Sequence, residues 1–245
     1  MESPFLEAHG LLKYIGLFLG GVCHQLPEHS IFIAGVQLPL CARCTGTYLG
    51  TVIGLVNLWW RGRSHASWLP PVRMLAVLVL FFAFWAIDGV NSYFNYLSGH
   101  VILYVPSNLL RLASGMVNGL SLSILVFPMF NFILWRNPER QRVVRDFGEL
   151  TAILLQVVAL VLVLRAGIGV LLYPFVLLNL VGVLTMLTIV NGMIVIILLR
   201  RENRAESRRQ ALLPLGLGLL LSIAEVGSIA TLRYVLAPAL VPPTL

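Results

Sequence analysis

Long apolar runs separated by short polar segments organise this chain. A helix that crosses the hydrocarbon core of a bilayer, about 30 Å thick, needs roughly 20 apolar residues. Six runs approach or exceed that length: Cys41–Trp60, Met74–Gly89, Ser107–Trp135, Glu149–Val170, Leu172–Leu199 and Ala211–Leu236. The apolar stretch Leu11–Val22 is too short to span easily and better suits an interfacial or re-entrant helix. The pattern predicts an all-α fold, a polytopic helical membrane bundle that forms one integral membrane domain over residues 1–245.

The composition agrees with a membrane location. Of the 245 residues, 58% are hydrophobic and only 11% are charged, whereas soluble domains carry about 25% charged residues. The isoelectric point near 9.8 is also typical of nucleic-acid-binding proteins, but here the arginines lie in short loops between apolar runs, the pattern of membrane topology. We therefore expect membrane lipids as partners and no nucleic acid.

The distribution of arginine predicts the orientation in the cell membrane. The loops after the first, third and fifth runs lie on one side and hold twelve of the 17 basic residues. These are Arg61, Arg63, Arg73, Arg136, Arg140, Arg142, Arg145, Arg200, Arg201, Arg204, Arg208 and Arg209. The positive-inside rule makes these loops cytoplasmic, and we interpret them as plain connectors. The segment before the first run and the loop Asp88–Pro106 then face outward.

All three cysteines lie in the outward-facing segment Gly20–Gly50. Cys41 and Cys44 form a C-x-x-C pair, and Cys23 adjoins His24. This spacing suits a tetrahedral zinc ion and equally suits a redox pair. We favour a zinc site formed by Cys23, His24, Cys41 and Cys44, with His29 as a spare ligand.

Two other interpretations of the cysteines stay open. A redox centre has an analogue in bacterial membrane thiol oxidoreductases, which carry C-x-x-C at the outer face and pass electrons to quinone, but this chain has no second C-x-x-C. A disulfide staple suits an outward location, but an odd number of cysteines leaves one thiol unpaired.

The first half of the chain, residues 1–119, carries the motifs "CHQLPEHS", "LPLCARCTGTYLG", "DG" and "SNLLRLASGMVNG". They resemble the motifs of a prokaryotic multi-pass membrane protein family known only as domain of unknown function family 2085. The resemblance implicates Cys23, His24, Gln25, Glu28, Ser30, Cys41, Arg43, Cys44, Gly46, Tyr48, Gly50, Asp88, Gly89, Asn108, Arg111 and Gly115. His29 departs from the family, which usually has Arg there. The resemblance implies a shared fold and site but no activity.

A second polar group is predicted on the outward side. Asp88 ends the second run, while Asn108 and Arg111 share one face of the first turns of the third. Arginine at the centre of a span costs roughly 2.5–3.5 kcal/mol and usually has a partner; Asp88 is the expected one, and Glu28 and Glu225 are others. These groups either lock the helices together or line a polar pocket for a phosphate or carboxylate. In the second case Asp88, Asn108 and Arg111 are candidate catalytic residues.

Glycines predict how the first and third runs meet. Gly46, Gly50 and Gly54 recur every four residues, as do Gly115 and Gly119. Such small-residue faces let helices approach closely in lipid, so we expect the first run to pack on the third and to bring the C-x-x-C pair near Arg111.

Three functional classes follow, and whether the chain is an enzyme stays open. The first is a metal-stabilised membrane protein whose outward pocket binds, or acts on, a small anionic or lipid-linked ligand. The second is a non-catalytic accessory subunit of a larger membrane complex, with other membrane-protein subunits as partners. The third is a thiol–quinone redox protein.

Overall fold

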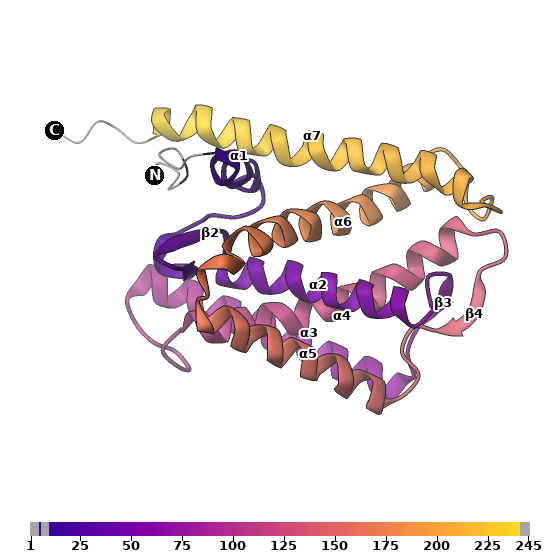
Figure 1. Ribbon diagram of the computed structural model, residues 1–245, viewed down its shortest axis with the longest axis horizontal. Helices are drawn as coiled ribbons and strands as arrows, with labels where there is room; N and C mark the ends of the chain where they lie inside the picture. Colours follow the sequence, from indigo (N-terminus) through magenta and orange to yellow (C-terminus); the bar gives the residue numbers. More distant parts are fainter. Residues whose placement is uncertain (1–4, 6–9, 241–245) are drawn as a thin grey trace.

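The computed structural model describes residue 5 and residues 10–240. Six long helices run roughly lengthwise through the bundle (Figure 1). They are α2 (Ala42–Trp60), α3 (Val72–Ser98), α4 (Asn108–Leu134), α5 (Phe147–Ala166), α6 (Leu172–Leu198) and α7 (Arg208–Leu240). Each long apolar run of the sequence therefore forms a helix, and the predicted helical membrane bundle is confirmed.

Five of these helices, α3 to α7, are long and apolar enough to cross a membrane. The sequence predicted six apolar spans. Helix α2 forms at the predicted position but is not among the five helices that are long and apolar enough to span. The buried face of α2 carries small and polar residues such as Thr45, Thr51 and Asn57, which lower its hydropathy. It packs on α4 and α6 and lies inside the bundle (Figure 1). Neighbouring helices therefore replace much of the lipid around it.

Helix α3 continues to Ser98, well beyond the predicted end at Gly89. The side chain of Asn91 donates to the carbonyl oxygen of Tyr104 at 2.9 Å and accepts from the amide of Leu103 at 3.1 Å. Because the loop after α3 supplies hydrogen-bond partners for the Asn91 side chain, the helix continues through the polar residues that follow Gly89. It ends at Gly99, whose φ of 71° is left-handed.

The short apolar stretch near the N-terminus forms α1 (Gly10–Leu19), a helix of 10 residues. At 1.5 Å per residue it is about 15 Å long, roughly half the hydrocarbon core. It contacts α7, α6 and β2 and is seen nearly end-on beneath α7 (Figure 1). Its length and its crosswise direction agree with a helix that does not span.

A β-hairpin that the sequence analysis missed leads into α2. Strands β1 (Ser30–Ile33) and β2 (Val36–Cys41) pair antiparallel. They are joined by Ala34 and Gly35, which both have positive φ, at 49° and 78°. Two central residues with positive φ are typical of a type I′ hairpin turn. The hairpin fixes Cys41 directly before the first residue of α2.

Close packing of α2 on α4 confirms the predicted glycine contact. A Cβ atom added at Gly46 would overlap the carbonyl oxygen of Leu112, and one at Gly119 would overlap the carbonyl oxygen of Thr47. The two backbones therefore touch, as small-xxx-small faces allow.

The arginine-rich loops gather at one end of the bundle, opposite the hairpin (Figure 1). They are more than plain connectors, which corrects our interpretation. Strand β3 (Ala66–Trp68) pairs parallel with β4 (Glu139–Arg142), so the first two of these loops are joined. Buried Arg63 donates to both carboxylate oxygens of Glu149 and to the carbonyl oxygen of Val143. The polar residues of these loops follow no sequence pattern that predicts either the strand pairing or the contact of Arg63 with Glu149.

Candidate functional site

Three of the four predicted metal ligands meet between α1 and α2. The ligand atoms of Cys23, His24 and Cys41 all lie within 4.8 Å of one another. Cys23 and His24 follow α1, and Cys41 ends β2 and caps the N-terminus of α2. The two thiols are buried while His24 is exposed, so the group has one side open to the surroundings.

Hydrogen bonds define which atoms of this group can bind a metal. The backbone amide of Cys41 donates to Sγ of Cys23 at 3.1 Å. The amide of Leu26 donates to Nδ1 of His24 at 3.1 Å, so Nδ1 is the acceptor and Nε2 carries the proton of the neutral ring. A metal bound at Nε2 therefore requires the other tautomer and the loss of this hydrogen bond. Hydrogen bonding between the thiols raises the pKa of Cys23 and lowers the pKa of Cys41 well below its ordinary value.

Cys44 lies one turn into α2, next to this group but outside the set of three. It is the second cysteine of the C-x-x-C pair, three residues after Cys41. The ring of His29 contacts the ring of His24, with 5.4 Å between centroids, and the ring of Tyr96, with 5.6 Å. His29 therefore packs against a ligand candidate, in line with a neighbouring rather than a primary role.

The donor set fits zinc. Thiolates and an imidazole are the ligands of structural zinc sites, which close at four donors, and Cys44 is the nearest candidate for the fourth. The hydrogen bond from the Cys41 amide favours the thiolate of Cys23 that a metal requires, but hydrogen bonding with the Cys41 side chain and burial outweigh it and raise the pKa of Cys23. All three cysteines are free thiols in the structure.

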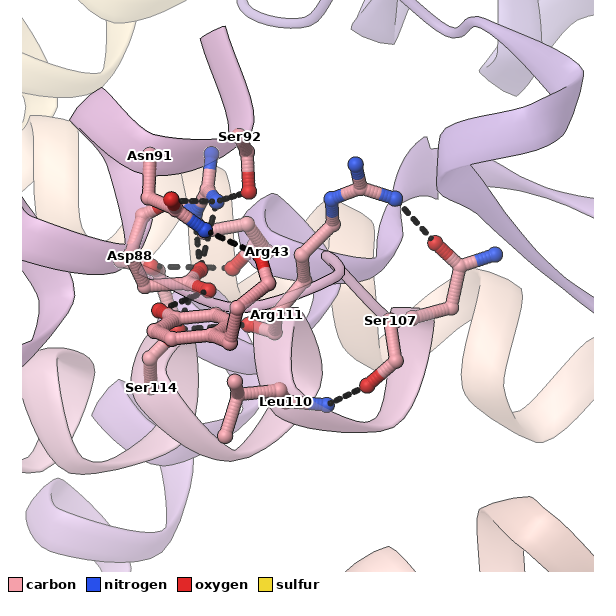
Figure 2. Close-up of polar contacts among 11 residues, drawn as sticks. Arg43, Asp88, Asn91, Ser92, Ser107, Leu110, Arg111 and Ser114 are labelled. Atoms are coloured by element: carbon pink, nitrogen blue, oxygen red, sulfur yellow. Dashed lines mark hydrogen bonds and ion pairs between the residues drawn. The ribbon is translucent and has the colours of Figure 1, made fainter. Parts of the chain in front are cut away.

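Asp88 pairs with Arg43, not with Arg111 as we predicted (Figure 2). Nη2 of Arg43 lies 2.5 Å from Oδ2 of Asp88, and its Nε lies 3.1 Å from the same oxygen. The hydroxyl of Tyr104 donates to Oδ1 at 3.0 Å and that of Ser114 to Oδ2 at 3.1 Å. Asp88 is fully buried. The close approach of α2 and α4 places Arg43, the arginine inside the C-x-x-C pair, against α3 and thereby decides the pairing.

Arg111 has a different role (Figure 2). Its Nη1 donates to Oδ1 of Asn108 at 2.7 Å, and Asn108 donates in turn to the carbonyl oxygens of Glu28 and Ser30. Its Nε is buried without a hydrogen-bond partner, and no carboxylate within residues 10–235 forms an ion pair with it. Asp88 therefore holds α2, whereas Asn108 contacts the residues that lead into the hairpin and orients Arg111. Ser114 lies between the two groups, because its hydroxyl contacts both Oδ2 of Asp88 and the carbonyl oxygen of Arg111.

A cavity of about 720 Å³ opens beside the thiols. Its lining includes Cys23, His24 and His29 from the N-terminal segment and Arg43 from α2. Tyr93 and Tyr96 of α3 and Arg233 of α7 complete the polar part of the wall. Elements distant in the sequence therefore meet at this cavity, into which Cys23 contributes a thiol.

Arg233 is the main site residue whose role the sequence analysis missed. Its guanidinium donates to three carbonyl oxygens, those of Gly20 at 2.9 Å, Cys23 at 2.5 Å and His24 at 2.8 Å. It thereby anchors the thiol segment to α7. Its position in the outer half of a span was the available signal, but nothing in the sequence pointed to backbone carbonyls more than 200 residues away.

Gln25, beside the first cysteine, is a second such residue. It is buried in a left-handed conformation with φ at 59°. Its side-chain nitrogen donates to the carbonyl oxygens of Gly16 at 2.6 Å and Pro39 at 2.8 Å. It therefore ties α1 to β2 on both sides of the thiol group, which gives a structural reason for the third letter of the "CHQ" motif.

Comparisons with known proteins agree with the motifs. Residues 23–125 match the family model described as "Predicted membrane protein (DUF2085)". An uncharacterised protein of Methanocaldococcus jannaschii is 25% identical over 134 residues, which are 53% of this chain and 80% of that protein. An uncharacterised protein of Methanothermobacter thermautotrophicus is 29% identical over 113 residues, 46% of this chain and 91% of that protein. No solved structure gives a significant match. The resemblance to this family of predicted membrane proteins is therefore confirmed over residues 23–125, the part of the chain that holds the thiols, Asp88 and Arg111.

Proposed function

We propose that this protein binds a small anionic or lipid-linked ligand in the cavity beside the thiols, at the outward face of the cell membrane. Zinc held by Cys23, His24, Cys41 and Cys44 would stabilise the cavity wall. One observation carries the proposal: the cavity combines the thiol–imidazole group with Arg233, an arginine whose hydrogen bonds go only to carbonyl oxygens.

The charges around the cavity support an anionic ligand. Of the two arginines that line the cavity, Arg43 is neutralised by Asp88, but Arg233 forms no ion pair with any carboxylate in the described residues. His24 adds an exposed imidazole. Unneutralised guanidinium groups in a concave, partly apolar site attract and orient phosphate or carboxylate.

The α3 side of the cavity supports an apolar tail on the ligand. Tyr93 and Tyr96 line the cavity and are also strongly exposed on the surface of α3. Tyrosine rings are typical of the membrane–water interface, where an apolar ring and a polar hydroxyl are both satisfied. A lipid-linked anion could therefore enter sideways past these rings.

The chain's own residues prepare the metal centre. Zinc, when bound, would cross-link the segment after α1 to the start of α2 and neutralise the thiolates. Gln25 and Arg233 position that segment from two sides. A metal would then add a third link to this segment, which is neither helix nor strand at Cys23 and His24.

Binding of a polyprenyl phosphate to the purified protein tests the proposal. We expect the phosphate to bind more tightly than the corresponding uncharged alcohol, and Arg233→Gln to weaken it about tenfold or more, as expected for the loss of a charge-assisted hydrogen bond. Arg165→Gln, which changes an exposed arginine outside this cavity, is the matched control. Equal affinity for phosphate and alcohol would contradict the proposal.

One observation favours the accessory-subunit alternative. Helix α7 lies at the edge of the bundle (Figure 1), and only 17% of its most apolar stretch is buried. A second membrane protein could cover that surface. Purification in mild detergent distinguishes the two functions, because an accessory subunit should co-elute with a partner in a fixed ratio.

A further inference from the structure

We propose that the arginine-rich end of the bundle holds one anionic phospholipid in a cavity between α4, α6 and α7. This site lies at the end opposite the thiols and is independent of the function proposed above. The cavity has a volume of about 310 Å³. Its apolar walls include Leu134 of α4, Val195 and Leu199 near the end of α6, and Leu213 and Pro214 at the start of α7.

Two arginines, Arg201 and Arg204, form the polar side of this cavity together with Gln210. Both lie in the loop between α6 and α7 and are exposed. Neither forms an ion pair with a carboxylate of the described chain, and Glu202, between them in sequence, pairs with neither. The cavity therefore presents two uncompensated guanidinium groups beside an apolar wall.

The loop that carries these arginines is held in place by backbone hydrogen bonds to the end of α4. The amide of Asn203 donates to the carbonyl oxygen of Ile133 at 2.7 Å, and that of Ala205 to Leu134 at 3.1 Å. The amide of Arg136 donates back to the carbonyl oxygen of Ala205 at 3.0 Å. The backbone that carries the two arginines is thus held in place before a ligand arrives, which lowers the entropy lost in ordering this loop on binding.

Three other arginines at this end form ion pairs. Arg61 and Arg63 share Glu149, and Arg136 pairs with Glu206. Arg201 and Arg204 differ from these because they have no ion pair in the described residues and both line the same apolar cavity. General attraction of a basic loop to an anionic membrane would not require this arrangement.

A phospholipid uses both parts of the site. Its phosphate accepts paired hydrogen bonds from guanidinium groups, and the start of an acyl chain fits the apolar wall. Leu198 and Leu212, exposed at 76% and 66%, lie next to the cavity in sequence and give the chain an apolar surface along which to continue. Basic pockets between helices at the arginine-rich side are typical sites for anionic lipid headgroups. Free phosphate would leave the apolar wall unused.

Native mass spectrometry of the full-length protein, titrated with phosphatidylglycerol, tests this site. With about 1 kcal/mol for each basic group, Arg201→Gln and Arg204→Gln should each weaken binding about fivefold, and the double variant about thirtyfold. Leu213→Trp should also weaken binding, because it fills the cavity without changing the charge. The matched control is Arg140→Gln/Arg142→Gln, which removes two exposed arginines of β4 at the same end and should leave the affinity unchanged.

Three results would overturn the proposal. The first is an equal loss of affinity in the β4 control, which would show general charge attraction. The second is unchanged binding in Leu213→Trp, which would show that the cavity is not used. The third is equal binding of phosphatidylcholine or of inorganic phosphate alone, which would show that the site does not select an anionic lipid.

Discussion

Replacing Asp88 by asparagine removes the charge at the centre of the contact between α2, α3 and α4. The carboxylate is fully buried and accepts hydrogen bonds from the side chains of Arg43, Tyr104 and Ser114. Asparagine keeps the shape and one acceptor oxygen but leaves the guanidinium of Arg43, only 20% exposed, without a counter-charge. Asp88→Asn should therefore destabilise the protein strongly without changing its fold.

The expected magnitude follows from the burial of the pair. Breaking a buried ion pair by removing one partner costs about 3–5 kcal/mol, and the retained acceptor of asparagine places Asp88→Asn near the lower end. At about 2–4 °C per kcal/mol for a chain of this size, the midpoint of thermal unfolding should fall by about 6–12 °C. Arg43→Gln should cost at least as much, because it leaves a carboxylate with no exposure unpaired.

Thermal unfolding in detergent, followed by tryptophan fluorescence, measures these changes. The double variant Arg43→Gln/Asp88→Asn should be more stable than the sum of the two single changes implies, because neither charge is left alone. Arg165→Gln, an exposed arginine that pairs with no carboxylate in the described residues, should change stability by less than about 0.5 kcal/mol. An unchanged midpoint in Asp88→Asn, or strict additivity in the double variant, would refute the reasoning.

Further predictions concern the helix contact and the anchoring of the thiols. Gly119→Val should reduce the yield of folded protein, measured by gel filtration in detergent, because its side chain meets the backbone of Thr47 and overpacking costs about 1–3 kcal/mol or more. Gly89→Ala is the control and should fold as the wild type does, because a Cβ there meets nothing within 4 Å. Arg233→Gln should speed maleimide labelling of Cys23, since it removes three hydrogen bonds that hold the thiol segment; an unchanged rate would mean that α7 does not anchor this segment. Once a chelator has removed the metal, maleimide should also label these cysteines in intact cells, as an outward location requires, and labelling only after permeabilisation would reverse the predicted orientation.

Hydrophobic length and small-residue spacing were enough to predict the helices and one central contact. The runs Ser107–Trp135 and Leu172–Leu199 match α4 and α6 to within a residue at each end, because a membrane imposes one length on apolar segments. The glycines at four-residue spacing correctly placed α2 against α4. The hairpin was missed because its turn residues, Ala34 and Gly35, are not one of the Asn-Gly, Asp-Gly or Gly-Gly pairs that mark a type I′ turn in a sequence.

The partners of individual charges could not be predicted in the same way. Asp88 and Arg111 were correctly expected at the same end of the bundle as the thiols. The choice between Arg43 and Arg111 as the partner of Asp88 depends on which helix face each arginine occupies once α2 touches α4. The same holds for Arg233, whose partners are backbone carbonyls. Every residue has a backbone carbonyl oxygen, so a contact to one does not depend on the residue type and leaves no pattern in a single sequence.

Metal content and thiol state, measured together on the purified wild-type protein, test the central claim most directly. The proposed zinc centre predicts one zinc ion per chain, with all three thiols protected from alkylation until a chelator removes the metal. Cys44→Ser should lower the zinc content and the stability together, if Cys44 completes the site. A metal-free protein with an oxidised Cys41–Cys44 pair would contradict the account and favour the thiol redox alternative.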